Sequence, residues 1–313
     1  MTQHAPPTPI LAAAPAVRTT GVSIAVPAAE RGRARQRRRL IRLLIGSSPL
    51  MLFLLIAILG PLVWPYDSVM VRTGERLKPP MEVLRDGSTA ILGTDQVGRD
   101  LLAQVLQGAR VSLLVGMSTV LLAGTVGLVI GVLAGYYGGW IDTVAMRIAD
   151  IQLAFPSILL AILIAGVLGP SITNVILTLS LTRWVTFARV TRAATLATKE
   201  REFVHAATAL GATDVRLLGL HVVPATVGPL VVVATVEVGL VIIAEASLSF
   251  LGLGTPGDQP SWGATIANGR AYLNTAWWIS TMPGLALSLV VLAVGRFGDQ
   301  VRDLLDPRSL SRT

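Results

Sequence analysis

The chain of 313 residues contains no cysteine. A disulfide framework and a metal site built from thiolates are therefore both excluded. Histidine is also scarce, and none of His4, His205 and His221 has a second histidine or a cysteine at ligand spacing. A zinc site built from protein side chains is therefore not expected.

Lysine is nearly absent, since only Lys78 and Lys199 occur. A Gly-x-x-x-x-Gly-Lys-Ser/Thr loop needs a lysine that reaches the phosphates cradled by backbone amides. Neither lysine lies in such a sequence, so the chain itself is not expected to hydrolyse ATP. It also offers no convincing Ser/His/Asp arrangement or carboxylate pair for hydrolysis, which argues against an enzyme.

Charged residues are few as well. They make up 14% of the chain, whereas hydrophobic residues make up 52% and the mean hydropathy is +0.66. A soluble domain typically has about 25% charged residues, so this composition indicates a membrane protein. The net charge of +8 is uneven, because seven arginines lie within residues 31–42. Such a run could bind nucleic acid, but beside an apolar segment it favours a cytoplasmic anchor.

Long apolar runs are abundant. A helix of about 20 residues crosses a bilayer core of about 30 Å. Six runs are long enough, namely 43–64, 111–134, 152–169, 172–190, 226–250 and 281–299. We therefore predict an all-α membrane protein with six transmembrane helices. The first run could instead be a secretory signal peptide, but it is long and no clear cleavage site follows it.

Six spans place both chain ends on one side of the membrane, and the arginine run marks that side as cytoplasmic. We expect a disordered cytoplasmic tail with a basic anchor over 1–42, a transmembrane domain over 43–309 and a cytoplasmic end over 310–313. The segments 65–110 and 251–280 would then lie outside. The first of them carries several basic residues and fits the charge rule less well.

Glycines recur at every fourth position near the end of the second predicted span, at Gly127, Gly131 and, just after the span, Gly135. Two overlapping GxxxG steps leave one helix face without side chains, so another backbone can approach closely. Packing within the chain is the favoured interpretation, and a contact between subunits is the alternative. Gly169 and Pro170 should break the helix between the third and fourth spans.

A polar stretch, residues 201–224, separates the fourth and fifth spans. We predict a helix over 199–210, a turn at Gly211, and a second short helix capped by Thr213 or Asp214. Pro224 suits the first turn of the helix that follows. A slim helix flanked by charges and held by two membrane helices suits docking to a soluble partner. An interfacial connecting loop is the alternative.

This stretch resembles the EAA motif of ABC importer permeases. The family pattern is Glu-Ala-Ala, three residues, a glycine, and a tail that often ends in proline. The corresponding region here, the loop of about 191–225, contains His205, Ala206, Ala207, Gly211, Asp214, His221 and Pro224. In that family the helix-turn-helix docks on the ATPase, so the resemblance implies that these residues couple ATP hydrolysis to the membrane helices.

One position departs from the family pattern. His205 stands where the family usually has glutamate, and a neutral histidine cannot pair with a basic residue of the ATPase. Glu202 lies three residues earlier, on roughly the same helical face. We therefore hypothesise that Glu202 makes the acidic contact.

Other segments extend the resemblance over about residues 40–309. "ILGTDQVGRDLLAQVLQGARVSLLVG", "GYYGGWID", "EASLSFLGLGTPGDQPSWG" and "GDQVRDLLDPR" look like the second permease subunit of dipeptide, oligopeptide and nickel importers. The resemblance implies the type I permease fold in a prokaryotic plasma membrane. It also implies four partners: a second, different permease, two ATPase domains and an extracytoplasmic solute-binding protein.

The same resemblance implies that ATP and Mg²⁺ are held by the ATPase chains and that this chain needs no cofactor. Peptides are the favoured solute, with nickel chelates or other small solutes as the alternative. A stand-alone secondary transporter is an alternative from a different class. The scarcity of intramembrane charges that could form an ion relay argues against it.

Glu245 is an ionisable residue within the fifth predicted span, close to Ser247 and Ser249. Such residues are expensive in a bilayer and suggest a role in the solute pathway or its gate. The favoured alternative is a polar anchor hydrogen-bonded to a nearby serine or to another helix.

Two outer segments suggest contacts with a binding protein. Thr94 or Asp95 could cap an amphipathic helix that leads into the second span. The glycines and prolines of 252–260 predict a turn at the outer face. This turn could face the binding protein, and simple loop closure is an equal alternative to that role.

Overall fold

The computed structural model describes residues 47–64 and 67–305. The chain divides into two units, residues 1–42 and 43–313, and everything described lies in the second. The predicted tail with its arginine run and the predicted end over 310–313 therefore lie outside the described residues.

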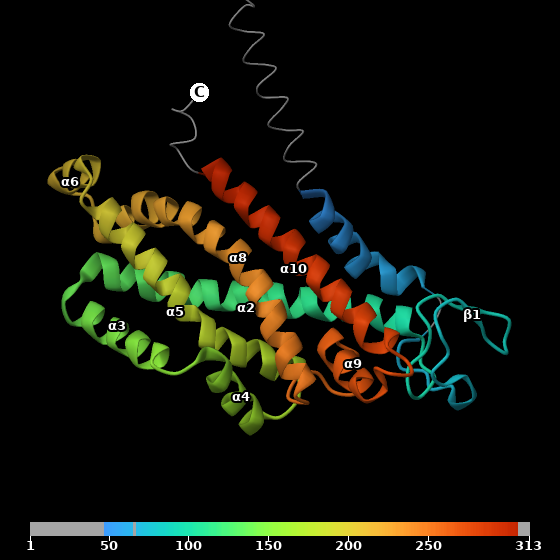
Figure 1. Cartoon of the computed structure of the whole chain (residues 1–313). Helices are drawn as coiled ribbons and strands as arrows, with labels where there is room; N and C mark the ends of the chain where they lie inside the picture. The colour runs from blue at the N-terminus through green and yellow to red at the C-terminus, as the bar shows by residue number, and fades with distance from the viewer. Residues whose placement is uncertain (1–46, 65–66, 306–313) are drawn as a thin grey trace, which may run out of the picture. The chain divides into compact units, whose positions relative to one another are not determined.

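Helices dominate the described chain (Figure 1). The first runs from Ser47 to Val63. The long helices that follow are α2 (Leu101–Tyr137), α3 (Gly139–Leu153), α4 (Ser157–Leu168), α5 (Ile172–Lys199), α8 (Val223–Phe250) and α10 (Trp278–Leu305). The short elements are a hairpin of β1 (Glu82–Val83) and β2 (Thr89–Ala90), and the helices α6 (Glu202–Ala209), α7 (Asp214–Leu217) and α9 (Trp262–Gly269).

Three helices of the described chain are long and apolar enough to cross a membrane: α2, α10 and the continuous run Asp214–Phe250 that includes α8. A fourth span is possible if α3 and α4 count as one, but the two are bent by 89°. The predicted continuous helix over 152–169 is therefore wrong. Pro156 explains the break, because proline cannot continue the hydrogen-bond ladder of α3. The count of six spans stays a prediction.

The predicted break after the third span is confirmed. α4 ends at Leu168 and α5 begins at Ile172. Gly169 between them has φ +78°, a left-handed conformation that costs glycine little. The amide of Asn174 then donates to the carbonyl oxygens of Leu168 and Gly169, which closes the turn.

The glycine face of α2 packs against α5 within the chain, as predicted. A Cβ on Gly131 would lie 2.5 Å from the carbonyl oxygen of Ala188, and one on Gly135 would lie 2.8 Å from Cβ of Thr195. One on Gly127 would lie 2.4 Å from Cβ of Phe187. No side chain fits at these positions, so the two backbones approach as GxxxG faces allow.

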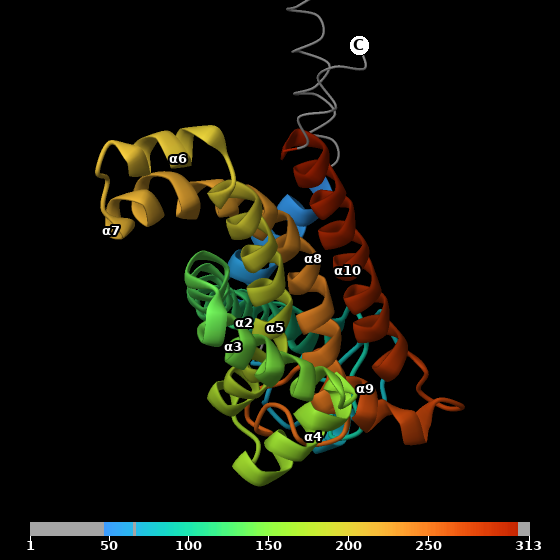
Figure 2. The same cartoon turned by 90° about the vertical axis from the view of Figure 1, so that its left-hand side faces the viewer.

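The core lies where α2, α5 and α8 meet. It contains Val115 from α2, Leu179 and Val185 from α5, and Val241 and Leu248 from α8. α10 runs beside α8 (Figure 1). The short helices lie at opposite ends of this bundle: α6 and α7 are at one end with the C-terminal end of α10, and α9 is at the other (Figures 1 and 2).

The start of α2 differs from the prediction. Asp100, not Thr94 or Asp95, caps the helix, and its carboxylate accepts a hydrogen bond of 2.7 Å from the amide of Ala103. Burial raises the pKa of Asp100. Thr94 and Asp95 are buried in the loop before the helix, where the side chains of both accept hydrogen bonds from backbone amides.

Candidate functional site

The polar stretch folds as two short helices joined by a glycine turn. α6 begins at Glu202 rather than at residue 199, because Lys199 is the last residue of α5. The ammonium of Lys199 donates a hydrogen bond of 2.7 Å to the carbonyl oxygen of Tyr136 and so joins the ends of α5 and α2. The prediction of a helix over 199–210 is thus wrong at its start.

The turn after α6 depends on Gly211, which has φ +83°. The amide of Gly211 donates to the carbonyl of Thr208, and that of Ala212 donates to the carbonyl of Ala207 at 3.0 Å. This is the hydrogen-bond pattern of a Schellman motif, in which the residue after the helix takes the left-handed conformation. The predicted turn at Gly211 is confirmed.

The second helix, α7, is a single turn. Thr213 occupies its N-cap position, but its side chain makes no capping hydrogen bond. The carboxylate of Asp214 instead accepts a hydrogen bond of 2.8 Å from the hydroxyl of Tyr136. A π-helical turn, Leu218–Val222, then leads into α8, where Pro224 lies in the first turn as predicted.

An apolar cluster fastens the two short helices to the end of α2. It consists of Tyr136, Val204, Leu217 and Val222, all buried, with Ala207 packed against it. The rings of Phe203 and His221 lie 5.5 Å apart, edge to face. α6 and α7 are therefore packed on the membrane helices and are not a loose loop.

The opposite side of α6 and α7 is exposed. Ala206 lies on this side, and two large apolar side chains stand out at the tip, Leu210 at 89% and Val215 at 80% exposed. Exposed apolar groups framed by charges are typical of a surface that another protein covers.

Glu202 and His205 both lie on the exposed side of α6. Neither side chain makes a hydrogen bond or an ion pair within residues 47–64 and 67–305. Both side chains are therefore available to a partner, and the geometry does not by itself favour one of them.

Glu245 is fully buried between two helices. Its carboxylate accepts hydrogen bonds from Ser249 in its own helix, at 2.7 Å, and from Ser112 in α2, at 3.4 Å. Ser247 does not join this group, because its hydroxyl donates to the carbonyl of Ile243. The contacts suit a polar anchor between α8 and α2, and a role in the pathway stays a prediction.

The sequence analysis missed a charge pair between α5 and α8. Arg183 of α5 and Glu237 of α8 approach to 3.6 Å, and the side chain of Glu237 is only 6% exposed. Both lie within predicted apolar runs, 172–190 and 226–250, so checking every predicted span for ionisable residues would have found both. The pair joins α5 to α8.

α3 is held to α5 by polar contacts. Asp142 and Arg192 form an ion pair with two hydrogen bonds. Asp150 pairs with Arg189 at 2.6 Å. Further along, the amide oxygen of Gln152 accepts from the indole of Trp184 at 2.8 Å. These contacts fix α3 just before the bend.

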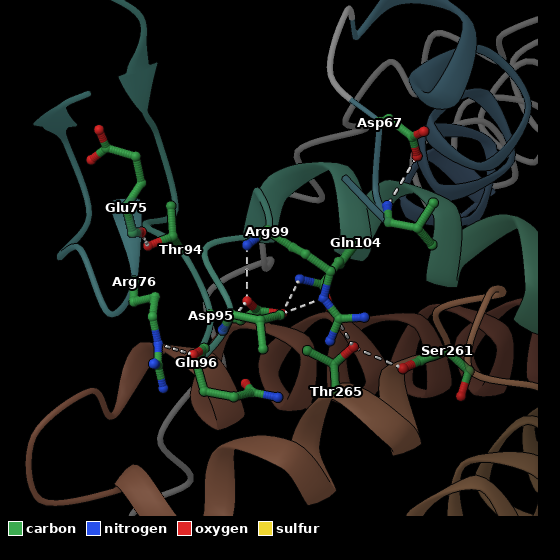
Figure 3. A network of polar contacts seen from close by, with 12 residues as sticks. Asp67, Glu75, Arg76, Thr94, Asp95, Gln96, Arg99, Gln104, Ser261 and Thr265 are labelled. Atoms are coloured by element: carbon green, nitrogen blue, oxygen red, sulfur yellow. Dashed lines mark hydrogen bonds and ion pairs between the residues drawn. The ribbon is translucent and has the colours of Figure 1, made fainter. Parts of the chain in front are cut away.

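A polar network organises the end of the bundle that carries α9 (Figure 3). Asp95 accepts hydrogen bonds from Arg99, at 2.6 Å, and from Gln104, at 3.0 Å. Gln104 in turn accepts from Thr265 of α9. Every member is buried or largely buried and has a partner, so the network ties the loop before α2 to α9.

The comparisons with known proteins agree with this geometry. The model of the family "Binding-protein-dependent transport system inner membrane component" matches residues 127–311. The chain belongs to that family and is a permease subunit of an ABC transporter.

Its relatives include a protein of Brucella suis described as a peptide transport system permease, 41% identical over 87% of this chain and 89% of the relative. The di/tripeptide transport system permease DppC of Pseudomonas aeruginosa is 38% identical over 83% of this chain and 86% of the relative.

The fold has a solved counterpart. A chain of the methionine ABC transporter MetNI, in an inward facing conformation, matches with a TM-score of 0.54 at 18% identity. The match covers 65% of this chain and 96% of that one. It supports the type I permease fold that the resemblance implied.

Proposed function

We propose that this chain forms one half of the membrane pathway of an ATP-driven importer of dipeptides and oligopeptides. A second, different permease supplies the other half. A solute-binding protein delivers the peptide from outside, and two ATPase domains holding ATP and Mg²⁺ bind inside. The chain ends and the α6–α7 segment are cytoplasmic in this proposal, whereas α9 and the β1–β2 hairpin are external.

The observation that carries the proposal is the construction of α6 and α7. Their inner side is packed on the end of α2, and their outer side presents Leu210, Val215 and the unpaired Glu202. A segment that is fixed on one side and exposed on the other suits transmission of force from a bound ATPase.

The contacts of this segment supply the route for that force. ATP binding closes the ATPase pair and shifts α6. The apolar cluster and the bond from Tyr136 to Asp214 pass the shift to α2. Lys199 joins the same carbonyl end of α2 to α5. Because these helices are closely packed, they move together and reorient the pathway between outward and inward openings.

Peptides are proposed as the solute because the named relatives are peptide and dipeptide permeases. Import of nickel chelates or another small solute by the same architecture is the second candidate. A stand-alone secondary transporter is not favoured, because the family consists of components of binding-protein-dependent systems.

Reconstitution tests the proposal. The complex is rebuilt in proteoliposomes from this chain and the permease, ATPase and binding-protein chains encoded beside it. Uptake of labelled dipeptides and of nickel chelates is measured with and without ATP. Peptide uptake that requires both ATP and binding protein is the expected result. Uptake of nickel chelates alone would mean that they, and not peptides, are the solute. Uptake by this chain without ATPases would overturn the importer assignment.

A further inference from the structure

An apolar groove runs between the first helix and α2, at the α9 end of the bundle. Its volume is about 490 Å³, and its walls include Ile58 and Leu62 from the first helix and Leu114 and Met117 from α2. These four side chains are 57%, 74%, 50% and 45% exposed, so the groove is open on the outside of the described bundle.

One charged residue lines this groove. The side chain of Arg110 is exposed and makes no hydrogen bond or ion pair within the described part of the chain. Residues 111–137, which complete α2, contain no charged side chain. Arg110 therefore marks one end of the uncharged stretch, at the depth where a membrane helix meets the lipid headgroups.

The surroundings change from apolar to polar on passing Arg110. A second, smaller hollow of about 170 Å³ lies between α2 and the end of the first helix with the residues that follow it, and it is lined by Trp64, Asp67 and Gln107. Gln107 lies three residues before Arg110 and so on the same face of α2. Tryptophan favours the membrane interface, which agrees with this depth.

We propose that the groove binds one phosphate-bearing membrane lipid. An acyl chain lies along Ile58, Leu62, Leu114 and Met117, and Arg110 donates hydrogen bonds to the phosphate. The order of apolar wall, cation and polar hollow matches the order of acyl chain, phosphate and headgroup. A guanidinium is well suited to a phosphate because its planar fork can bind two oxygens at once. The site is independent of the solute that the transporter carries.

Native mass spectrometry of the assembled transporter tests the site. Dioleoyl phosphatidylglycerol is the probe, and dioleoylglycerol, with the same chains but no phosphate, is the comparison. Arg110→Gln is expected to lower retention of the phospholipid by about tenfold, the loss of one charge-assisted contact. Arg110→Lys keeps the charge and should retain most of it. Arg147→Gln is the matched control, because Arg147 is exposed on α3, has no partner in the described residues and does not line the groove.

Three results would overturn the proposal. Equal retention by Arg110→Gln and Arg147→Gln would show that Arg110 selects no phosphate. Equal retention of the two lipids by the unchanged protein would show that the groove is a nonspecific apolar surface. The chain has no cysteine, so Met117→Cys gives a single reactive site. Cross-linking of that cysteine to the second permease or to residues 1–46 would show that protein, not lipid, fills the groove.

Discussion

The hydroxyl of Tyr136, in the last turn of α2, donates a hydrogen bond of 2.8 Å to Asp214, which lies 78 residues later in α7. Apart from the apolar cluster, this side-chain bond is what fixes the α6–α7 segment to the end of a long membrane helix. It connects the surface proposed to face the ATPase with the helix whose glycines pack on α5.

We predict that Tyr136→Phe weakens the coupling of ATP hydrolysis to transport. The substitution removes the hydroxyl and keeps the buried ring, so about 1 kcal/mol is lost and the fold is retained. Uptake per ATP hydrolysed in proteoliposomes should fall several-fold. Tyr137→Phe is the control, since the neighbouring ring is exposed and makes no hydrogen bond in the described chain. An equal loss in both variants would contradict the role of the bond.

Gly211→Ala should loosen the turn between α6 and α7. A left-handed conformation costs a residue with a Cβ roughly 1–2 kcal/mol, although nothing lies within 4 Å to obstruct the new methyl group. Hydrogen exchange over residues 202–217 should become faster, and ATPase binding weaker. Gly219→Ala, also in open space but without a positive φ, should leave both unchanged. Faster exchange in the control alone would refute this explanation.

The hypothesis on the acidic contact predicts an asymmetry between two exposed neighbours. Glu202→Ala should uncouple ATP hydrolysis from transport more than His205→Ala does, because only the carboxylate can pair with a basic residue of the ATPase. The measurement is the ratio of solute uptake to phosphate release. Normal coupling in both variants would contradict the hypothesis.

Gly131→Val should disrupt the seam between α2 and α5. A Cβ at this position would lie 2.5 Å from a backbone oxygen, so the helices must separate, at a cost of about 3 kcal/mol. The yield of folded protein and its thermal stability in detergent should both drop. Gly166→Val, in α4 and facing open space, provides the comparison and should be tolerated. Equal stability of the two variants would argue that the seam is not tightly packed.

The pair of Arg183 and Glu237 should show non-additive energetics. Glu237→Gln leaves the guanidinium without its charge partner, and the side chain of Arg183 is only 20% exposed. We expect a loss of about 2 kcal/mol, less than for a fully buried pair. The double variant Arg183→Gln/Glu237→Gln should recover part of this stability. Additive losses in thermal unfolding would mean that the two groups do not interact.

The sequence by itself determined the class of protein and much of its local structure. Apolar runs located the long helices, because a membrane helix must satisfy its backbone internally and needs about 20 apolar residues to do so. The glycine spacing predicted a close helix contact, and Gly211 and Gly169 predicted their turns. These features depend on neighbours within a few residues, so they can be read from the chain.

Only the tertiary structure decided which groups meet. The sequence offers Thr213 or Asp214 as a helix cap, yet Asp214 accepts a hydrogen bond from Tyr136, because that hydroxyl reaches it from another helix. The sequence offers Thr94 or Asp95 as the cap of the helix that leads into the second span. In the structure Asp95 accepts hydrogen bonds from Arg99 and Gln104, and Asp100 caps the helix instead. The bend at Pro156 and the pair of Arg183 with Glu237 are likewise features that only the tertiary structure showed. Packing determines which residues far apart in sequence come into contact, and the local spacing of residues does not contain that information.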